Sequence, residues 1–277
     1  MTRLKTEDLM PAMGNMQAYN EKMREILGVG IHGVAAHALG LEEKTVALAL
    51  QASTVGIIPI SSGEGLISGF SQLLFETASF LGCKTQILAQ DQEGFAQAKR
   101  DNYEIILWSD DDSYWAENLP FAFHAENGWA TGLGYAAALD LMISRCQYEK
   151  KVLVLGAGPV GRSAAYALCL AGYQVVLCDK EREKSVNYAK TLTNCMGVDL
   201  ETIASCAPYS CMLDATPADT LYVEKYLTKN PCITAPCVPC PWVGRKEYAA
   251  KLWHDPLQLG TAIMLASAVT RTTNHAH

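Results

Sequence analysis

The segment Lys151-Val-Leu-Val-Leu-Gly156-Ala-Gly158-Pro-Val-Gly161 constrains the fold of this chain more than any other part of the sequence. Its apolar run predicts a buried strand at Val152–Leu155, and the residues that follow predict an alanine-rich helix at Val160–Ala171. A glycine-rich turn between a buried strand and a helix is the sequence pattern of a dinucleotide-binding unit. The alternative is that the glycines serve only the packing of the helix on the strand.

Each glycine of the motif has a distinct expected task. Gly156 forms the tight turn after the strand, Gly158 lets the backbone approach a pyrophosphate, and Gly161 lets the helix pack closely on the strand. Pro159 and Val160 open the helix, whose N-terminus offers unpaired N–H groups and the positive end of its dipole to that anion. We therefore expect all five residues to contact a dinucleotide cofactor in a Rossmann-type domain.

An acidic residue follows the next predicted strand, Tyr173–Cys178. This residue, Asp179, lies roughly 20 residues after Gly161, where a carboxylate accepts hydrogen bonds from the ribose hydroxyls of the cofactor. A carboxylate there repels a 2′-phosphate, so NAD is expected rather than NADP. Two alternatives remain: Asp179 is a solvated residue at a strand end, or the neighbouring Lys180 and Arg182 hold a phosphate.

Strands alternate with helices on both sides of the motif, which predicts parallel sheets joined by right-handed crossovers. The other predicted strands are Val55–Ile60, Thr85–Ala89, Ile105–Trp108, Cys211–Leu213 and Cys232–Ala235. The other predicted helices are Glu7–Leu27, Leu41–Gln51, Glu64–Leu81, Asp91–Arg100, Thr131–Cys146, Glu181–Cys195, Gly244–Leu252 and Gly260–Val269. The polar stretch Ser109–Ala130 is expected to be a long irregular loop.

The predicted fold class is therefore α/β with two domains. Residues 1–148 are expected to form an N-terminal α/β substrate domain, and residues 149–277 a C-terminal Rossmann-type NAD-binding domain that ends in a helix. The active site is expected in a cleft between them, because ligands of open α/β sheets bind at the carboxyl ends of the strands.

Composition excludes several classes of partner. The formal net charge is −7 and the pI is about 5.4, which argues against nucleic acids and anionic membrane surfaces as partners. The chain has no run of about 18 apolar residues and no signal-peptide core near its start. Its ten cysteines are therefore expected to stay reduced, and a cytoplasmic location is expected. A hydrophobic share of 49% predicts a large core and a buried subunit interface.

Two polar loops follow predicted strands in the first half of the chain. Ser61-Ser62-Gly63-Glu64-Gly65 combines hydroxyls and glycines before a predicted helix, which is typical of an anion site. The alternative, equally supported by the residues, is an ordinary N-cap at Ser62. The second loop, Asp110-Asp111-Asp112, can hold an ammonium group or be a solvated loop, and no further oxygen ligands accompany it to bind a metal.

Two further loops follow predicted strands in the second half. Asp214-Ala-Thr216-Pro217 is expected to lie over the nicotinamide half of the cofactor, with Thr216 and Pro217 in contact with it, and Pro236 lies in the next such loop. That loop also holds a C-x-x-C motif, Cys237 and Cys240. Such a motif is able to bind zinc, here with Cys206 and Cys211, or to be redox-active. The surrounding prolines predict a rigid loop with neither property, so no metal is expected.

Several of these segments together resemble the PylD family of pyrrolysine-forming enzymes, over about residues 4–267. The most specific segments are Val55–Gly65, Glu104–Asp111, Gly156–Gly161, Asp214–Pro217 and Pro256–Ala262. The resemblance implies two α/β domains with substrate between them, a homodimer formed through the first domain, and NAD as the cofactor.

The resemblance also implies the reaction and the residues that bind its substrate. NAD would oxidise the terminal amine carbon of L-lysine-Nε-3-methyl-D-ornithine, ammonia would be lost, and the ornithine α-amine would close the pyrroline ring. The expected substrate contacts are Leu4, Ser62, Asp110, Asn127 and the position of Glu64, where the family has asparagine. Ser61 is expected beside Ser62 in this site, and Thr261, in the last matching segment, is expected to contact the cofactor.

No side chain is assigned as a catalytic acid or base. Three amines and one carboxylate on the substrate suit an acidic cleft, and catalysis is then mainly positioning of the reactive carbon and exclusion of water. One rival is a shikimate-dehydrogenase-like reductase, whose lysine–aspartate pair has no matching motif among the lysines of the first domain. The other is a non-catalytic NAD-binding protein.

Overall fold

The computed structural model describes residues 4–272, which divide into two compact units. Residues 4–21, 30–130 and 256–272 form the first unit, and residues 22–29 and 131–255 form the second. The division differs from the expected domains 1–148 and 149–277, because the chain returns to the first unit at residue 256. Within the described residues, no helix is long and apolar enough to cross a membrane.

The first unit is built on a five-stranded mixed sheet in the order β2-β1-β3-β4-β5. Its strands are β1 (Thr54–Ile58), β2 (Lys84–Ile87), β3 (Ile105–Ser109), β4 (Tyr114–Asn118) and β5 (Phe123–Glu126). The first three are parallel, and β4 and β5 add to β3 as antiparallel strands. Because β1 and β3 are parallel neighbours, the loops that follow them lie at the same edge of the sheet.

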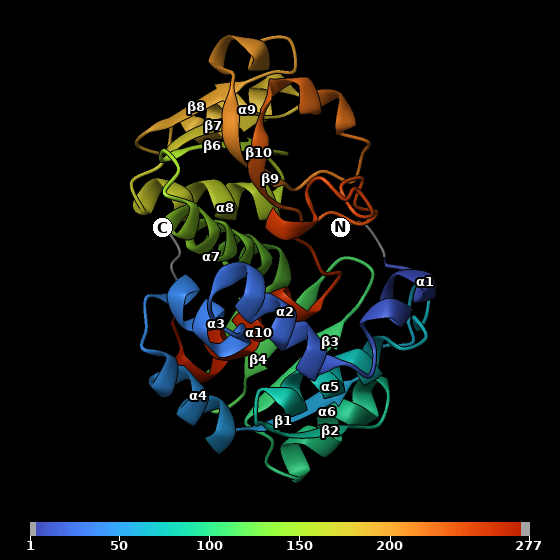
Figure 1. The fold of residues 1–277 in the computed structure, drawn as a ribbon. Helices are drawn as coiled ribbons and strands as arrows, with labels where there is room; N and C mark the ends of the chain where they lie inside the picture. Colours follow the sequence, from blue (N-terminus) through green and yellow to red (C-terminus); the bar gives the residue numbers. More distant parts are fainter. Residues whose placement is uncertain (1–3, 273–277) are drawn as a thin grey trace. The chain divides into compact units, whose positions relative to one another are not determined.

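Helices from three parts of the chain surround this sheet (Figure 1). They are α1 (Thr6–Leu9), η1 (Met10–Ala12), the start of α2 (Met16–Leu27), α3 (Ile31–Leu39), α4 (Glu43–Ala52), α5 (Phe70–Phe80), α6 (Asp91–Arg100) and α10 (Gln258–Thr270). The last helix, α10, is buried from its first residue to Ala268 and packs against α3, α4, α5 and β4. It is thus the central helix of the first unit rather than the end of the second.

The expected loop Ser109–Ala130 contains the antiparallel strands β4 and β5 instead. Alternate side chains of β4 are buried, and its last residue, Asn118, hid this pattern because asparagine is typical of loops. Asn118 is buried with both ends of its amide bonded: Nδ2 donates to Ala268 O (2.9 Å), and Oδ1 accepts from Phe121 N (3.3 Å). The sequence alone does not reveal these buried partners, so it predicts a loop at such a residue.

The second unit is built on a six-stranded parallel sheet in the order β11-β10-β9-β6-β7-β8. Its strands are β6 (Lys151–Leu155), β7 (Gln174–Cys178), β8 (Cys195–Val198), β9 (Tyr209–Asp214), β10 (Leu227–Thr234) and β11 (Leu252–Trp253). The chain proceeds from β6 to one side through β7 and β8, and then returns to its other side with β9. The sheet therefore has a switch point between β6 and β9, where ligands of such sheets bind.

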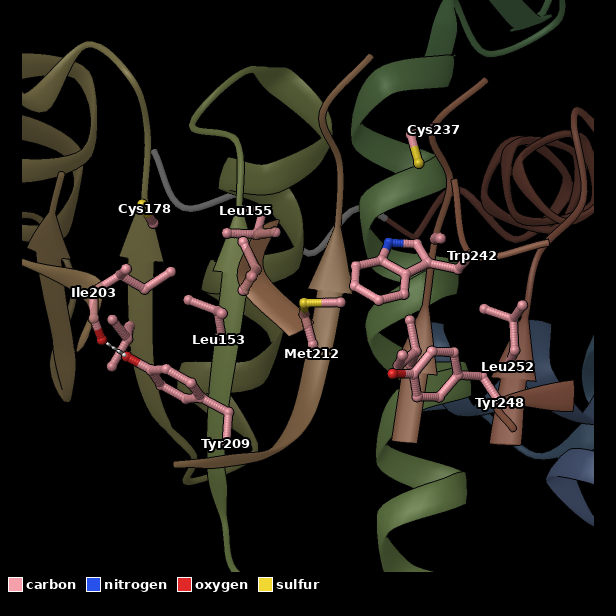
Figure 2. Close-up of a cluster of buried hydrophobic side chains, with 14 of the residues drawn as sticks. Leu153, Leu155, Cys178, Ile203, Tyr209, Met212, Cys237, Trp242, Tyr248 and Leu252 are labelled. Atoms are coloured by element: carbon pink, nitrogen blue, oxygen red, sulfur yellow. Dashed lines mark hydrogen bonds between the residues drawn. The ribbon is translucent and has the colours of Figure 1, made fainter. Parts of the chain in front are cut away.

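The helical segments of the second unit are most of α7 (Asn127–Cys146), α8 (Pro159–Leu170), α9 (Arg182–Ala189), η2 (Ile203–Cys206), η3 (Leu221–Tyr226) and η4 (Ala249–Lys251). A buried cluster of side chains from β6, β7, β9 and the segment after β10 forms much of its core (Figure 2). Trp242 and Tyr209 are fully buried members of this cluster. The expected α/β fold with two sheets is confirmed, and the first of these sheets is mixed rather than parallel.

Several predicted helices are wrong in extent. The helix predicted at Glu7–Leu27 is divided into α1, η1 and α2. The helix predicted at Glu64–Leu81 begins only at Phe70, and the one predicted at Glu181–Cys195 ends at Ala189 and is followed by the edge strand β8. Gly244–Leu252 forms turns and a single short 3-10 segment. Trp242 and Tyr248 are both buried there, with their rings 5.6 Å apart, so tertiary packing rather than helical spacing decides this backbone.

Candidate cofactor and substrate sites

The turn after β6 requires glycine at two positions. Gly156 has a φ of +91°, and a Cβ there would lie 2.9 Å from the carbonyl oxygen of Ala215. A Cβ on Gly161 would lie 1.8 Å from the carbonyl oxygen of Gly156, so the first turn of α8 packs directly on the strand turn. These two glycines are explained by the chain itself, by backbone conformation and by close packing.

Gly158 is different, because no backbone conformation and no close contact within the described chain requires glycine at this position. It is the N-cap of α8, with φ −76° and ψ −176°, a conformation that any residue adopts. A Cβ there would meet no atom within 4 Å, and the residue is exposed. No side chain caps α8, so the N–H groups of its first turn have no capping partner in the part of the chain described. Open space beside uncapped N–H groups fits the pyrophosphate of a dinucleotide.

Asp179 follows β7 and lies against the same turn. Its Oδ2 accepts a hydrogen bond from Ala157 N (2.7 Å), and its Oδ1 accepts one from Glu181 N (2.9 Å). The carboxylate is therefore oriented by the backbone and stays partly exposed. Arg182, one of the two alternative phosphate ligands, pairs with Asp199, with 3.5 Å between Nε and Oδ2.

Asp214, at the end of β9, organises the next loop. Its fully buried carboxylate accepts hydrogen bonds from Thr216 N (3.1 Å), Thr216 Oγ1 (2.7 Å) and Trp242 Nε1 (2.8 Å), and also from the hydroxyl of Thr220. Burial raises the pKa of Asp214, and the hydrogen bonds from Thr220, Trp242 and Thr216 oppose that rise. The hydroxyl of Thr216 is thus used within the loop, while Pro217 is exposed.

We predict that Asp214→Ala lowers the free energy of unfolding by about 2–4 kcal/mol, because buried donors lose their acceptor. Urea unfolding followed by tryptophan fluorescence measures this change. Asp219→Ala is the matched control: Asp219 is exposed and accepts only the Leu221 N–H, at 3.0 Å, so its loss should change stability by less than about 1 kcal/mol. Equal effects of the two substitutions would contradict the organising role of Asp214.

The two remaining residues expected at the cofactor lie in different units. Pro236 is half-buried in the loop after β10 of the second unit. Thr261 lies in α10 of the first unit and is fully buried; its Oγ1 lies 2.9 Å from Tyr114 Oη and donates to Leu257 O (3.0 Å). The hydroxyl of Thr261 is thus used inside the first unit, and its contact with a cofactor stays a prediction.

In the first unit, the loop after β1 is held by a carboxylate from α6. Ser61 donates to Asp91 through its backbone N–H (2.8 Å to Oδ1) and through its hydroxyl (2.5 Å to Oδ2). The hydroxyl bond first, and the backbone bond second, lower the pKa of Asp91. Because α5 begins at Phe70 with Gly69 as its N-cap, the expected N-cap at Ser62 is wrong. The exposed side chain of Ser62 lies instead in a loop that leads to that helix.

The acidic loop after β3 contacts this first loop. Asp111 Oδ2 accepts a hydrogen bond from Glu64 N (2.9 Å), and a Cβ on Gly63 would lie 1.9 Å from the same oxygen. Asp110 closes its own turn, since its Oδ1 accepts from Asp112 N (3.0 Å) and Ser113 N (2.8 Å). The structure thus brings together two of the predicted substrate loops. Asp111 joins the two loops, whereas the adjacent Asp110 bonds within its own turn.

Leu4 and Asn127 lie elsewhere in the first unit, and both are half-buried. Leu4 precedes the N-cap of α1, and Asn127 is the first residue of α7. The start of α7 is bonded to Glu126, whose two carboxylate oxygens accept from Gly128 N and Trp129 N at 2.8 Å each. Among residues 4–272, no group of three or more His, Cys, Asp or Glu side chains is placed to hold a metal ion.

The sequence analysis missed three carboxylates that organise these loops: Asp91, Asp111 and Glu126. Asp91 was predicted only as the first residue of a helix, and its φ of +54° shows that it is a special position. Glu126 accepts from two backbone donors at the start of α7, but glutamate is not among the preferred N-cap residues, so no sequence pattern identified it. The contacts of Asp91 and Asp111 join residues 30 and 47 positions apart, so no local pattern reveals them.

Comparison with known proteins agrees with this arrangement. The family model described as "Pyrrolysine biosynthesis protein PylD, N-terminal domain" matches residues 9–122. The pyrrolysine synthase of Methanosarcina barkeri is 28% identical over 272 residues, which are 97% of this chain and 98% of that protein. The chain is similar to the PylD family along nearly its whole length. It is an enzyme, as the sequence analysis expected, and the similarity extends through both units.

Solved structures show how the PylD fold relates to other enzymes. Quinate dehydrogenase from Corynebacterium glutamicum, determined in complex with NAD, superposes with a TM-score of 0.51 at 16% identity, covering 78% of this chain and 92% of that one. Shikimate dehydrogenase from Aquifex aeolicus gives 0.50 at 16% identity, covering 79% and 91%. These similarities show a shared fold. A second family model, described as "FAD binding domain", matches residues 149–200, the segment from β6 to β8.

Proposed function

We propose that this chain oxidises the terminal amine carbon of L-lysine-Nε-3-methyl-D-ornithine with NAD, and that loss of ammonia and ring closure then yield L-pyrrolysine. The observation that carries this proposal is the 28% identity to a pyrrolysine synthase along 97% of the chain. Since that similarity includes both the glycine turn and the polar loops of the first unit, it supports a shared substrate as well as a shared fold. We also propose a homodimer, which light scattering of the purified chain would check.

The second unit would hold the cofactor at the switch point of its sheet. Gly158 leaves space for the pyrophosphate, the first N–H groups of α8 bind it, and Asp179 accepts the ribose hydroxyls. When bound, NAD supplies the hydride acceptor. The rigid turn and the bonded loop at Asp214 orient the site before the cofactor enters, and this lowers the entropic cost of binding.

The first unit would hold the substrate with the loops after β1 and β3 together with Leu4 and Asn127. The Asp110 carboxylate accepts a hydrogen bond from a substrate ammonium group, while Ser61 and Asp111 keep the loops in place. Ser62 and Glu64 are the exposed members of the first loop that contact the substrate. No protein nucleophile is needed, because the α-amine of the substrate attacks its own oxidised C=NH carbon and displaces ammonia as the ring closes. The chain therefore contributes positioning and exclusion of water.

Asp179→Asn should weaken NAD binding about tenfold, which is about 1.4 kcal/mol, and should reduce the preference for NAD over NADP. The amide keeps one oxygen for the backbone donors that now bind Asp179, so the turn should persist. Titration calorimetry with NAD and NADP measures both changes. A wild-type chain that already prefers NADP, or that is purified with a bound flavin, would contradict the assignment of NAD.

Turnover tests the reaction class. The purified chain, NAD and the lysine–ornithine amide should form NADH, while shikimate and quinate in place of the amide should not. Quinate and shikimate are the substrates to compare because the fold is shared with their dehydrogenases. NADH formation with either acid but not with the amide would assign the chain to that reaction instead. Tight NAD binding without turnover on any of the three would favour a non-catalytic protein.

A further inference from the structure

The cysteine pair Cys237 and Cys240 has no role in the proposed reaction. It lies in the loop after β10, and the parallel pairing of Thr234 with Trp253 brings the residue after β11, His254, to the same edge of the sheet. Cys237 belongs to the buried cluster drawn in Figure 2, and the half-buried Cys240 packs against it. Two thiols and an imidazole therefore meet in the second unit.

Three donors converge on the sulfur of Cys240: the thiol of Cys237, the imidazole of His254 and the backbone N–H of Trp242. The ring of His254 is oriented by a separate contact, in which Nδ1 lies 2.7 Å from Ala235 O. A carbonyl only accepts, so Nδ1 carries the hydrogen, and the other ring nitrogen is left to share a proton with Cys240. The indole of Trp242 is itself anchored on Asp214 Oδ2 at 2.8 Å, which fixes the loop.

These contacts shift the pKa values of the two thiols in opposite directions. The hydrogen bonds from Cys237 and then from His254 lower the pKa of Cys240, against the opposing effect of its burial. The bond to Cys240 and burial raise the pKa of Cys237. Burial disfavours a charged His254, but its contacts with Cys240 and with Ala235 O raise its pKa overall. These opposite shifts favour the thiolate at Cys240 and the thiol at Cys237.

Another cysteine pair in the same unit provides a comparison. Cys169 of α8 and Cys195 of β8 also share a hydrogen bond, but no imidazole takes part in it. They lie far apart in the sequence, on a helix and an edge strand, whereas Cys237 and Cys240 share one short loop. A thiolate, an adjacent second thiol and a positioned imidazole occur together at Cys237–Cys240, and these are the parts that thiol–disulfide exchange requires.

We propose that Cys237 and Cys240 form a thiol–disulfide exchange site that reacts with small disulfides. The Cys240 thiolate attacks one sulfur of the disulfide RSSR, which forms a mixed disulfide and releases RS⁻. His254, which holds the proton of Cys240, passes it to this RS⁻ and becomes neutral. Cys237 then gives its own proton to the neutral His254 and attacks the Cys240 sulfur, which releases the second RS⁻ and closes a Cys237–Cys240 disulfide; His254 passes this proton to the second RS⁻. The two cysteines are oxidised by two electrons, RSSR is reduced to two RSH, and the protons come from the two cysteines. This proposal does not depend on the proposed reaction.

Oxidised glutathione is the probe, with peptide mass spectrometry as the readout on the full chain. The wild-type chain should lose two hydrogens from the peptide that holds both cysteines. Cys237→Ser should instead accumulate one glutathione on Cys240, because the second thiol is missing. Cys240→Ser should do neither, while the control Cys169→Ser should behave as the wild type. Circular dichroism of each variant checks that it is folded.

A rate measurement on the unmodified chain needs no variant. Iodoacetamide at pH 6 should label Cys240 at least tenfold faster than Cys169 or Cys195, because the thiolate is the reactive form. His254→Asn, whose amide can still donate to Ala235 O, should raise the pH midpoint of this labelling by roughly one unit, because the thiolate loses the stabilisation that the imidazole provides. Equal labelling of Cys240 and Cys169, or glutathione attached to Cys237→Ser at cysteines other than Cys240, would overturn the proposal.

Discussion

Gly161→Ala should lower the free energy of unfolding of the second unit by about 3 kcal/mol or more, as overpacking against backbone does at its upper end. Helix propensity alone predicts the opposite, a gain of about 1 kcal/mol for alanine over glycine inside a helix. The clash decides the sign, since the new Cβ would lie 1.8 Å from the carbonyl oxygen of Gly156. Because that atom belongs to the backbone of a tight turn, it cannot rotate away.

Gly158→Ala is the matched control and should have the reverse profile. Its Cβ meets no protein atom within 4 Å and its φ is ordinary, so stability should stay within about 1 kcal/mol of the wild type. The added methyl group instead occupies the space assigned to the pyrophosphate. NAD binding should weaken at least tenfold, which is about 1.4 kcal/mol.

Urea unfolding and titration calorimetry with NAD, run on both variants, separate these two effects. The expected pattern is a stability defect for Gly161→Ala and a binding defect on a stable fold for Gly158→Ala. If Gly158→Ala bound NAD as tightly as the wild type, the open space beside α8 would not be the pyrophosphate site. If Gly161→Ala were as stable as the wild type, the close packing of α8 on the turn would be wrong.

Asp110→Asn should lower kcat/KM at least tenfold, about 1.4 kcal/mol of transition-state stabilisation, while NAD affinity stays unchanged. The substitution removes the charge and keeps the shape. Asp110 Oδ1, which accepts from Asp112 N and Ser113 N, has an equivalent in the asparagine amide, so the turn after β3 should persist. The loss then reports the carboxylate–ammonium contact, because charge-assisted hydrogen bonds are about twice as strong as neutral ones.

Asp112→Asn is the control for this experiment, since its side chain is exposed in the same turn and contributes only a backbone N–H to Asp110. It should retain the activity of the wild type. Steady-state kinetics with the lysine–ornithine amide at saturating NAD measures both variants. Equal losses from the two substitutions, or full activity of Asp110→Asn, would rule out an ammonium site at Asp110.

The elements predicted most accurately are those whose sequence pattern and burial agree. The helix α6 has the predicted bounds, Asp91–Arg100, and β6 differs from its prediction by only one residue. The strand was easy to predict because Val152–Leu155 are all buried, as in parallel strands that are covered on both faces. The strands β4 and β5 were missed where buried polar residues such as Asn118 interrupt that agreement. The position of α10 was not predictable from its apolar composition, because a fully buried helix has no face that identifies its neighbours.

The cofactor half of the site follows from local sequence, while the substrate half does not. The glycine turn and Asp179 lie within two neighbouring strand–turn segments, so spacing alone places them together. The loops at Ser61 and Asp110 are joined by contacts of Asp91 and Asp111 that span many residues, and only the structure reveals them. His254 is separated in sequence from Cys237 and Cys240 in the same way, and the sequence therefore predicted an inert loop there.

Mass spectrometry of the reaction product tests the central claim most directly. The purified chain is incubated with NAD and L-lysine-Nε-3-methyl-D-ornithine, and the product is compared with authentic L-pyrrolysine. We predict one NADH for each product molecule, whose mass is that of the substrate less one ammonia and two hydrogens, with Asp110→Asn forming it at least tenfold more slowly. Unchanged substrate in the presence of bound NAD, or an oxidised product that retains its terminal nitrogen, would contradict the account.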